Sequence, residues 1–114
     1  MIDPRLTDYL GHMLTAANDA LRFVDGMNRQ EFLADKRTQQ AVIMSLVIIG
    51  EASARIMDQH QEFAAAHPII PWPGMRGMRN RMAHGYFDIN LELVWDTVQT
   101  ALPDLAKQLE PLLR

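Results

Sequence analysis

One octet of this chain, residues 79–86, combines an arginine, an asparagine, a histidine and a tyrosine in the order Arg-Asn-Arg-Met-Ala-His-Gly-Tyr. Such side chains can hold a phosphate, orient a hydroxyl group and move a proton. They pair a fixed positive charge with an imidazole that titrates near neutral pH. His84 follows Asn80 by four positions, and Tyr86 follows His84 by two. The octet is therefore the best candidate in the chain for a chemically active site.

The octet also lies in the longest stretch of the chain that lacks acidic residues. No Asp or Glu occurs between Glu62 and Asp88. The same stretch contains three arginines, Arg76, Arg79 and Arg81. The formal net charge of the whole chain is −3, so the chain without these three charges is at −6. A positive island in an acidic protein favours an anionic ligand.

We expect a short helix over residues 72–85 to carry most of the octet. Pro73 suits its first turn, where a missing N–H needs no partner. Arg76, Asn80 and His84 are spaced four residues apart, so they would form one row on a helix face. Part of the opposite side holds methionines that would pack the helix onto the protein, Met75, Met78 and Met82.

Arg79 and Tyr86 would lie outside this row. Arg79 precedes His84 by five residues, which is about 140° around a helix axis and about 7.5 Å along it. Only its long side chain could then bring the guanidinium group towards the imidazole. Gly85 would end the helix and leave Tyr86 to fold back over its C-terminal edge.

These side chains could cleave an RNA phosphodiester without a metal ion. His84 can take the proton of a 2′-hydroxyl or protonate the leaving oxygen. Arg79 can stabilise the extra negative charge at phosphorus through its forked donors. Asn80 can orient the histidine or hold a phosphate oxygen, and Arg76 is a further supporting residue. Such cleavage needs an acid and a base, so a two-fold dimer that brings two copies of His84 into one cleft would complete the site.

The same residues also allow interpretations without catalysis. A histidine in the last turn of a helix is favoured by the helix dipole alone. Three arginines on a short helix can simply form a solvated face. A non-catalytic module that binds a nucleotide or a protein partner would use the arginines but no general base. A purely structural helical dimer would need neither the arginines nor a general base.

The N-terminal third predicts one long helix and a turn. Asp3 before Pro4 is typical of a capped helix start. Apolar residues then recur at helical spacing as far as a stop near Gly26. Asn28 and Glu31 form a capping box that leads into a short turn.

A second and longer helix should run from about residue 35 to about residue 60. Its centre, residues 42–49, is apolar on most sides, which suits burial by neighbouring helices, a second subunit included. Glu51 follows this centre, and its carboxylate needs a cationic or hydrogen-bonding partner. Arg55, four residues later, is the local candidate, which favours a structural ion pair over a catalytic role for this glutamate.

Prolines shape the second half of the chain. Three of them within residues 67–74 forbid a continuous helix there and predict a loop. The last helix should start near Asp88 or Asn90, and Pro103 should bend or break it. Two tryptophans are expected to anchor the packing, Trp72 and Trp95.

No segment alternates with the period of a strand. We therefore expect an all-α, four-to-five-helix up-and-down bundle in a single domain over residues 1–114. The absence of cysteine excludes disulfides and thiolate metal sites, and no histidine–carboxylate spacing suggests a metal, so no cofactor is expected. The N-terminus lacks the pattern of a leader, and the longest apolar run, residues 46–49, is far too short to span a bilayer. These features favour a cytoplasmic protein.

Arg79-Asn80-x-x-x-His84 resembles the R-x4-6-H signature of HEPN-domain ribonucleases. With Tyr86 it is similar to the R-x4-H-x-Y motif of the HepT toxins, the partners of minimal nucleotidyltransferase antitoxins. The resemblance covers nearly the whole chain. It includes Asp3-Pro4, Ile49-Gly50-Glu51-Ala52, Ile70-Pro71-Trp72, Val94-Trp95 and Leu102-Pro103.

This resemblance implies the toxin of a type II toxin–antitoxin system: a HEPN-like homodimer whose motifs meet in a cleft at the interface. Arg79 and His84 match the catalytic pair of an endoribonuclease, and Asn80 matches the polar residue that often follows the arginine. Tyr86 matches the tyrosine to which the antitoxin transfers AMP, which blocks the site. The antitoxin would be a separate nucleotidyltransferase chain.

Overall fold

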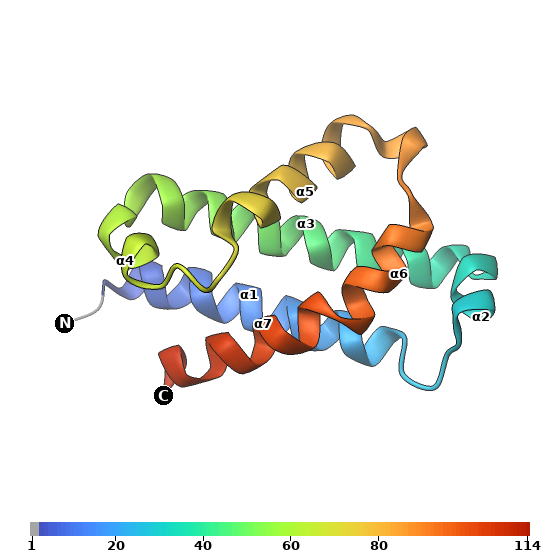
Figure 1. The fold of residues 1–114 in the computed structure, drawn as a ribbon, viewed down its shortest axis with the longest axis horizontal. Coiled ribbons are helices and arrows are strands. Elements are labelled where there is room, and N and C mark those ends of the chain that lie inside the picture. The colour runs from blue at the N-terminus through green and yellow to red at the C-terminus, as the bar shows by residue number, and fades with distance from the viewer. Residues whose placement is uncertain (1–2) are drawn as a thin grey trace.

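The computed structural model describes residues 3–114, which form helices and turns without any β-strand in that range. Four long helical segments run in alternating directions along the molecule (Figure 1). They are α1 (Pro4–Phe23), α3 (Lys36–Gln59), α5 (Trp72–His84) and the consecutive pair α6 (Leu91–Gln99) and α7 (Ala101–Leu109). Short elements join or follow them: α2 (Arg29–Ala34), α4 (Gln61–Ala66), and the 3₁₀ turns η1 (Tyr86–Asp88) and η2 (Glu110–Leu113). The predicted all-α bundle is confirmed.

The predicted helix starts in the N-terminal third are also confirmed. The Asp3 carboxylate accepts a hydrogen bond from the backbone N–H of Arg5 at 2.8 Å. Asn28 and Glu31 form the capping box, each side chain accepting from the other's backbone N–H at 2.9 Å. Gly26 has a φ of 78°, a left-handed conformation that favours glycine in the turn after α1. Local hydrogen bonds thus set where these helices begin and end.

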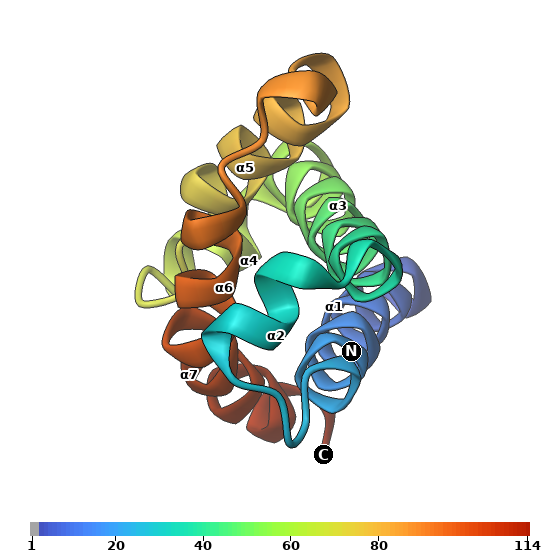
Figure 2. The ribbon, with the colours of Figure 1, turned by 90° about the vertical axis from the view of Figure 1, so that its right-hand side faces the viewer.

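Helix α3 is the centre of the bundle. It packs against α1 on one side and against α5 on another (Figure 2). By length and composition it is the one helix of residues 3–114 that could cross a membrane, but 56% of the apolar window lies buried inside the protein. Its core residues include Val42, Leu46, Ile49 and Ile56. The apolar character of α3 therefore serves the core of the bundle.

The segment between α3 and α5 contains one helix that the sequence did not predict. Helix α4 has six residues and no fully buried side chain, so it is too short to show a helical period. The predicted loop over 67–74 ends at residue 71, because Trp72 and Pro73 open α5. The buried indole N–H of Trp72 donates to the carbonyls of Ala64 at 3.2 Å and His67 at 3.1 Å. Trp72 is therefore a packing anchor that ties α4 and the loop to the start of α5.

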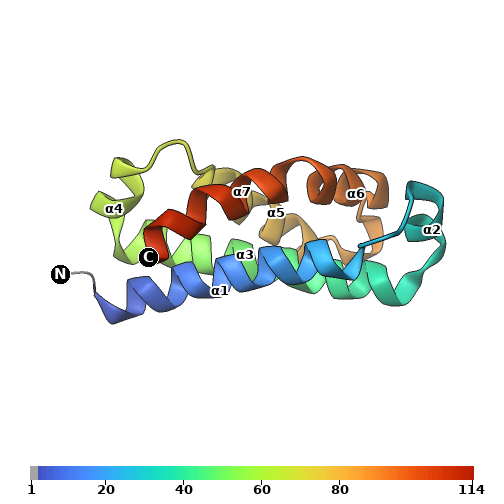
Figure 3. The same ribbon diagram turned by 90° about the horizontal axis from the view of Figure 1, so that it is seen from below.

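The last helical segment breaks as Pro103 predicts. Helix α6 ends at Gln99 and α7 begins at Ala101, because the proline ring conflicts with the carbonyl of the residue four positions earlier. Asn90 caps α6 by accepting from the backbone N–H of Leu93 at 3.0 Å. Trp95 packs against Phe32 with ring centroids 5.4 Å apart, which confirms it as a packing anchor. Both helices then cover the core, with α7 lying along α1 (Figure 3).

The cap of α3 predicts a pH-dependent contribution to stability. Hydrogen bonds from the backbone N–H and then the hydroxyl of Thr38 hold the pKa of Asp35 below its ordinary value. A depressed folded-state pKa means that this contribution is fully present above the unfolded-state pKa, and it is lost as pH falls through the folded-state pKa. Asp35→Ala should therefore unfold at a lower urea concentration than the wild type at neutral pH. The difference between their urea midpoints should shrink below about pH 4. Asp35→Asn is the control, because it keeps an oxygen acceptor. A difference in urea midpoint between wild type and Asp35→Ala that stays constant with pH would contradict the assignment.

Candidate functional site

The octet occupies the end of α5 and the turn that follows it. The helix ends at His84, and the N–H of Gly85 bonds the carbonyl of Arg81 at 2.8 Å. Asn80 and His84 are exposed on the outer face, as their spacing predicts. The inner face holds the predicted methionines: Met75 and Met82 are buried and Met78 is half-buried. The helix therefore docks through methionine and presents its polar row outwards.

Helix α5 lies in direct contact with α3 at Gly50. A Cβ atom placed on Gly50 would lie 2.2 Å from Cβ of Arg79 and 2.6 Å from the backbone oxygen of Met75. No residue with a side chain fits there unless the two helices separate. The glycine therefore lets the stem of Arg79 lie directly on the backbone of α3.

This contact brings Arg79 to Glu51, the residue after Gly50. Nη1 of Arg79 donates to Oε1 of Glu51 at 2.6 Å, and Nε of Arg55 donates to Oε2 at 3.1 Å. The predicted pair with Arg55 is confirmed. The pair with Arg79 was missed, because 28 residues separate the two in sequence. The glycine inside an otherwise apolar helix was the one signal of a close approach here.

The guanidinium group of Arg79 is only partly accessible. Its side chain is 24% exposed. Its Nε is buried and has no hydrogen-bond partner among residues 3–114. Glu51 thus holds one edge of the guanidinium group, and donors that this ion pair does not use remain for a ligand.

The positive island of the sequence is partly neutralised in the fold. Arg76 lies 3.4 Å from a carboxylate oxygen of Asp58 on α3, much as Arg79 faces Glu51. Arg81 forms no ion pair within the described part of the chain, and its Nη1 lies 3.5 Å from the Cβ position of Gly77. Two of the three arginines are therefore paired with carboxylates on α3, and only Arg81 keeps an unpaired charge among the described residues.

Tyr86 leaves the helix after Gly85, and its hydroxyl reaches α3. Nε2 of Gln40 donates to Oη of Tyr86 at 3.1 Å, and the tyrosine is 48% exposed. Sequence reasoning missed Gln40, which lies 46 residues away and belongs to no recognisable motif. Gln40 and Glu51 are about 16 Å apart along α3. Helix α3 therefore contacts the octet at both of its ends.

An exposed apolar stripe lies between these two contacts on α3. Met44 is 58% exposed and Ile48 is 40% exposed. Together with Gln40 and Glu51 they are spaced by four, four and three residues, so all four share one helix face. The sequence predicted that this part of the helix would be buried all round, and this face is the exception within the single chain.

His84 and Arg79 do not meet within one chain. Arg79 is turned towards α3, whereas His84 lies on the exposed face and its imidazole forms no hydrogen bond to the described residues. Their separation of five residues produces this divergence, as helical geometry predicts. No group of three or more His, Cys, Asp or Glu side chains in residues 3–114 is arranged to hold a metal ion.

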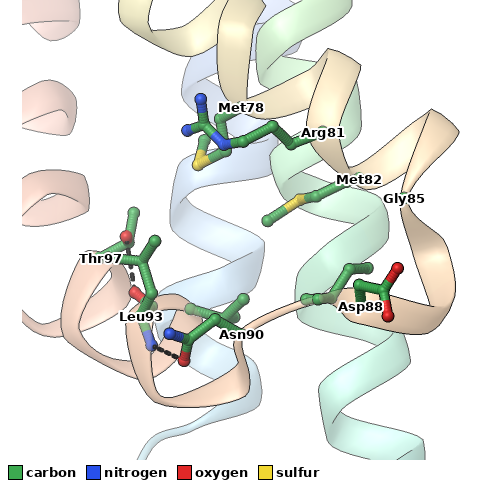
Figure 4. Close-up of a pocket in the computed structure, with 10 residues that line it drawn as sticks. Met78, Arg81, Met82, Gly85, Asp88, Asn90, Leu93 and Thr97 are labelled. Atoms are coloured by element: carbon green, nitrogen blue, oxygen red, sulfur yellow. Dashed lines mark hydrogen bonds between the residues drawn. The ribbon is translucent and has the colours of Figure 1, made fainter.

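A pocket of about 140 Å³ lies on the other flank of α5, between this helix and α6 (Figure 4). Met78, Met82 and Leu93 form much of its apolar lining, and Arg81 and Asp88 are its charged groups. The amide of Asn90 and the hydroxyl of Thr97 are engaged with the backbone of Leu93. Neither catalytic candidate lines this pocket, so it is separate from the site on the α3 side.

Comparisons with known proteins agree with the resemblance in the motif. The family described as ribonuclease HepT-like matches residues 13–112. The chain is 38% identical over 106 residues to a protein of Methanocaldococcus jannaschii that is named as an RNase, covering 93% of this chain and 85% of that one. It is 39% identical over 105 residues to a protein of Thermococcus cleftensis that is named as a ribonuclease HepT, covering 92% and 93%. No solved structure matches the chain.

The contact at Gly50 predicts a position-specific effect of adding one methyl group. Gly50→Ala should destabilise the protein by about 1–3 kcal/mol, because Arg79 and the α5 backbone must move. Gly11→Ala is the matched control, since no atom of residues 3–114 would lie within 4 Å of a Cβ there. That substitution in α1 should stabilise by roughly 0.5–1 kcal/mol. Urea unfolding measures both, and equal effects of the two substitutions would contradict the close contact.

Proposed function

Because the chain belongs to the ribonuclease HepT-like family, we propose that it is the toxin of a type II toxin–antitoxin pair and cleaves RNA internally without a metal ion. The family and its relatives named as ribonucleases support endoribonuclease activity. The observation that carries the assignment of the site is the anchoring of Arg79 on Glu51, on the same helix that exposes His84. Arg79 and His84 are the proposed catalytic pair, and Asn80 and Arg76 support them.

In the proposed reaction Arg79 binds the phosphate. Its stem is packed at Gly50 and one nitrogen is held by Glu51, so the guanidinium group has little freedom to lose when RNA binds. Donors that Glu51 does not use can contact the non-bridging oxygens, where negative charge grows in the transition state. Glu51 thus acts as a positioning residue.

His84 moves the protons of the reaction. One imidazole takes the proton of the 2′-hydroxyl as its oxygen forms a bond to phosphorus. The bond from phosphorus to the 5′-oxygen breaks, and that oxygen receives a proton from an imidazolium. The products are a 2′,3′-cyclic phosphate and a free 5′-hydroxyl. Two copies of His84 in a homodimer would supply the base and the acid.

The exposed stripe of α3 supports this homodimer. Met44 and Ile48 expose apolar area between the two contacts that α3 makes with the octet. Covering this area with a second copy would remove it from water and bring two motif helices close together. The interface would then contain the site, as the separation of Arg79 from His84 requires.

Tyr86 is the proposed point of control. Its half-exposed hydroxyl lies two residues from His84. Attack of Oη on the α-phosphorus of ATP would release pyrophosphate and the phenolic proton and leave AMP on the tyrosine. The added phosphate and base would occupy the space that RNA needs at His84. A separate nucleotidyltransferase chain, the antitoxin, would catalyse this transfer.

Substitution at the catalytic pair tests the reaction. His84→Ala should lower the rate of RNA cleavage by roughly 100-fold or more, because proton transfer by a positioned side chain is lost. Arg79→Ala should cause a comparable loss. Arg22→Ala removes an exposed arginine in the last turn of α1, outside the proposed site, and should cleave like the wild type. Cleavage of single-stranded RNA is followed on gels with EDTA present.

The same assay separates the alternatives. Equal survival of RNA with wild type and His84→Ala would end the nuclease proposal. A nucleotide or protein partner that still binds, and binds more weakly to Arg79→Ala, would then identify a non-catalytic binding module. Absence of any binding at low salt would identify a structural helical dimer.

Modification of Tyr86 has its own test. Co-expression with the cognate nucleotidyltransferase should add AMP to the wild-type chain, as measured by intact mass. Tyr86→Phe should stay unmodified. The chain contains two tyrosines, and Tyr9→Phe is the matched control that should still gain AMP. An unchanged mass of the wild type would remove this role.

A further inference from the structure

Phe87 is the most exposed large apolar side chain of the described residues. It is 98% accessible, whereas the next, Ile69, is 74% accessible. A phenylalanine in this position contributes almost nothing to the core. It directly follows Tyr86 and lies three residues after His84, so their Cα atoms are at most about 11 Å apart. An exposed aromatic ring therefore lies close enough to the proposed general base for neighbouring parts of one RNA strand to contact both.

Phe87 and Tyr86 form one wall of a groove. Their ring centroids are 6.0 Å apart and their planes meet at 79°, an edge-to-face arrangement. The opposite wall comes from the first turns of α3, with Lys36, Gln39 and Gln40. Three aliphatic side chains complete the lining, Ile43, Ile89 and Leu91. The groove thus combines aromatic faces, amide groups and one cation.

Hydrogen bonds hold three of the side chains that line the groove, while the ring of Phe87 is almost fully accessible to a ligand. Gln40 donates to Oη of Tyr86 at 3.1 Å, and Gln39 donates to the carbonyl of Phe32 at 2.9 Å. Lys36 forms no ion pair within residues 3–114 and is the only charged residue that lines the groove. The two carboxylates adjacent in sequence to groove residues do not line the groove: Asp35, next to Lys36, accepts hydrogen bonds from Thr38, and Asp88, next to Phe87, lines the pocket on the far side of α5. The electrostatic balance of the groove therefore favours an anionic ligand with a flat, apolar face.

We propose that this groove binds an unpaired base of the RNA, in a nucleotide that flanks the scissile phosphate. Phe87 stacks on the base, and Lys36 contacts the adjoining backbone phosphate. This inference rests on the proposed ribonuclease function, because the position of the base is defined relative to His84. Stacking on an aromatic ring accepts any base, since every base has a π face, and it requires single-stranded RNA.

Binding of a cleavage-resistant, 2′-O-methylated single-stranded RNA tests the proposal by fluorescence anisotropy. Phe87→Ala should weaken binding roughly 5- to 100-fold, the range expected for loss of one stacked base. Phe87→Leu should also bind this RNA more weakly than the wild type, whereas Phe87→Trp should bind it as tightly as the wild type. Ile69→Ala, a second exposed apolar residue outside the groove, should bind like the wild type. The slope of affinity against salt should stay the same for wild type and Phe87→Ala, because stacking releases no counterions.

A matched change in the RNA makes the test specific. An abasic nucleotide at the contacted position should bring wild type and Phe87→Ala to the same affinity. Equal affinity of the two proteins for intact RNA would overturn the inference, and so would a smaller sedimenting species for Phe87→Ala, which would place Phe87 in a subunit interface. In either case cleavage that depends on His84 would leave the ribonuclease proposal standing. Failure of the wild type to bind or cleave any RNA would instead reject both.

Discussion

The absence of a side chain at Gly50 fixes the relation between α3 and α5, and the geometry of the octet follows from it. At this point the backbone of one helix touches the stem of an arginine on the other. The next residue, Glu51, thereby comes within 2.6 Å of Arg79. If a side chain held the helices apart, the guanidinium group of Arg79 would lose its contact with Glu51. The absence of a methyl group at Gly50 therefore decides whether Glu51 can hold the guanidinium group of Arg79.

Helix α3 serves two purposes with different faces. One side provides the core through residues such as Leu46 and Ile49. The exposed stripe carries Gln40 and Glu51, which hold the two ends of the octet, with Met44 and Ile48 between them. A rigid helix buried along one side is a better support for such contacts than a loop, because its side chains have fixed relative positions. The proposed dimer would use the same stripe as its contact surface.

The charges around the octet show how an acidic protein can present an arginine to an anion. Two of the three arginines face carboxylates on α3, at Asp58 and Glu51. Such pairing lowers the net positive charge but limits the motion of each guanidinium group, and exposed pairs of this kind contribute little to stability. These ion pairs act here by orienting the guanidinium groups. Arg79 keeps unused donors in a fixed place, which suits binding of a phosphate better than a mobile positive charge does.

Local sequence patterns predicted the long helices, several of their ends and the row of polar residues on α5. Those features depend on interactions between residues at most about four positions apart: caps at Asp3, Asn28 and Asp35, and the break that Pro103 causes. The sequence did not reveal α4, and it predicted a turn where α2 forms a helix over Arg29–Ala34, because six residues are too few to show a helical period. The residues that hold the octet could not be predicted in this way, because the partner of Arg79 lies 28 residues away and the partner of Tyr86 lies 46 residues away. A helical repeat specifies which face is buried, but the neighbour that a given side chain meets depends on how closely two helices approach, and here Gly50 sets that distance.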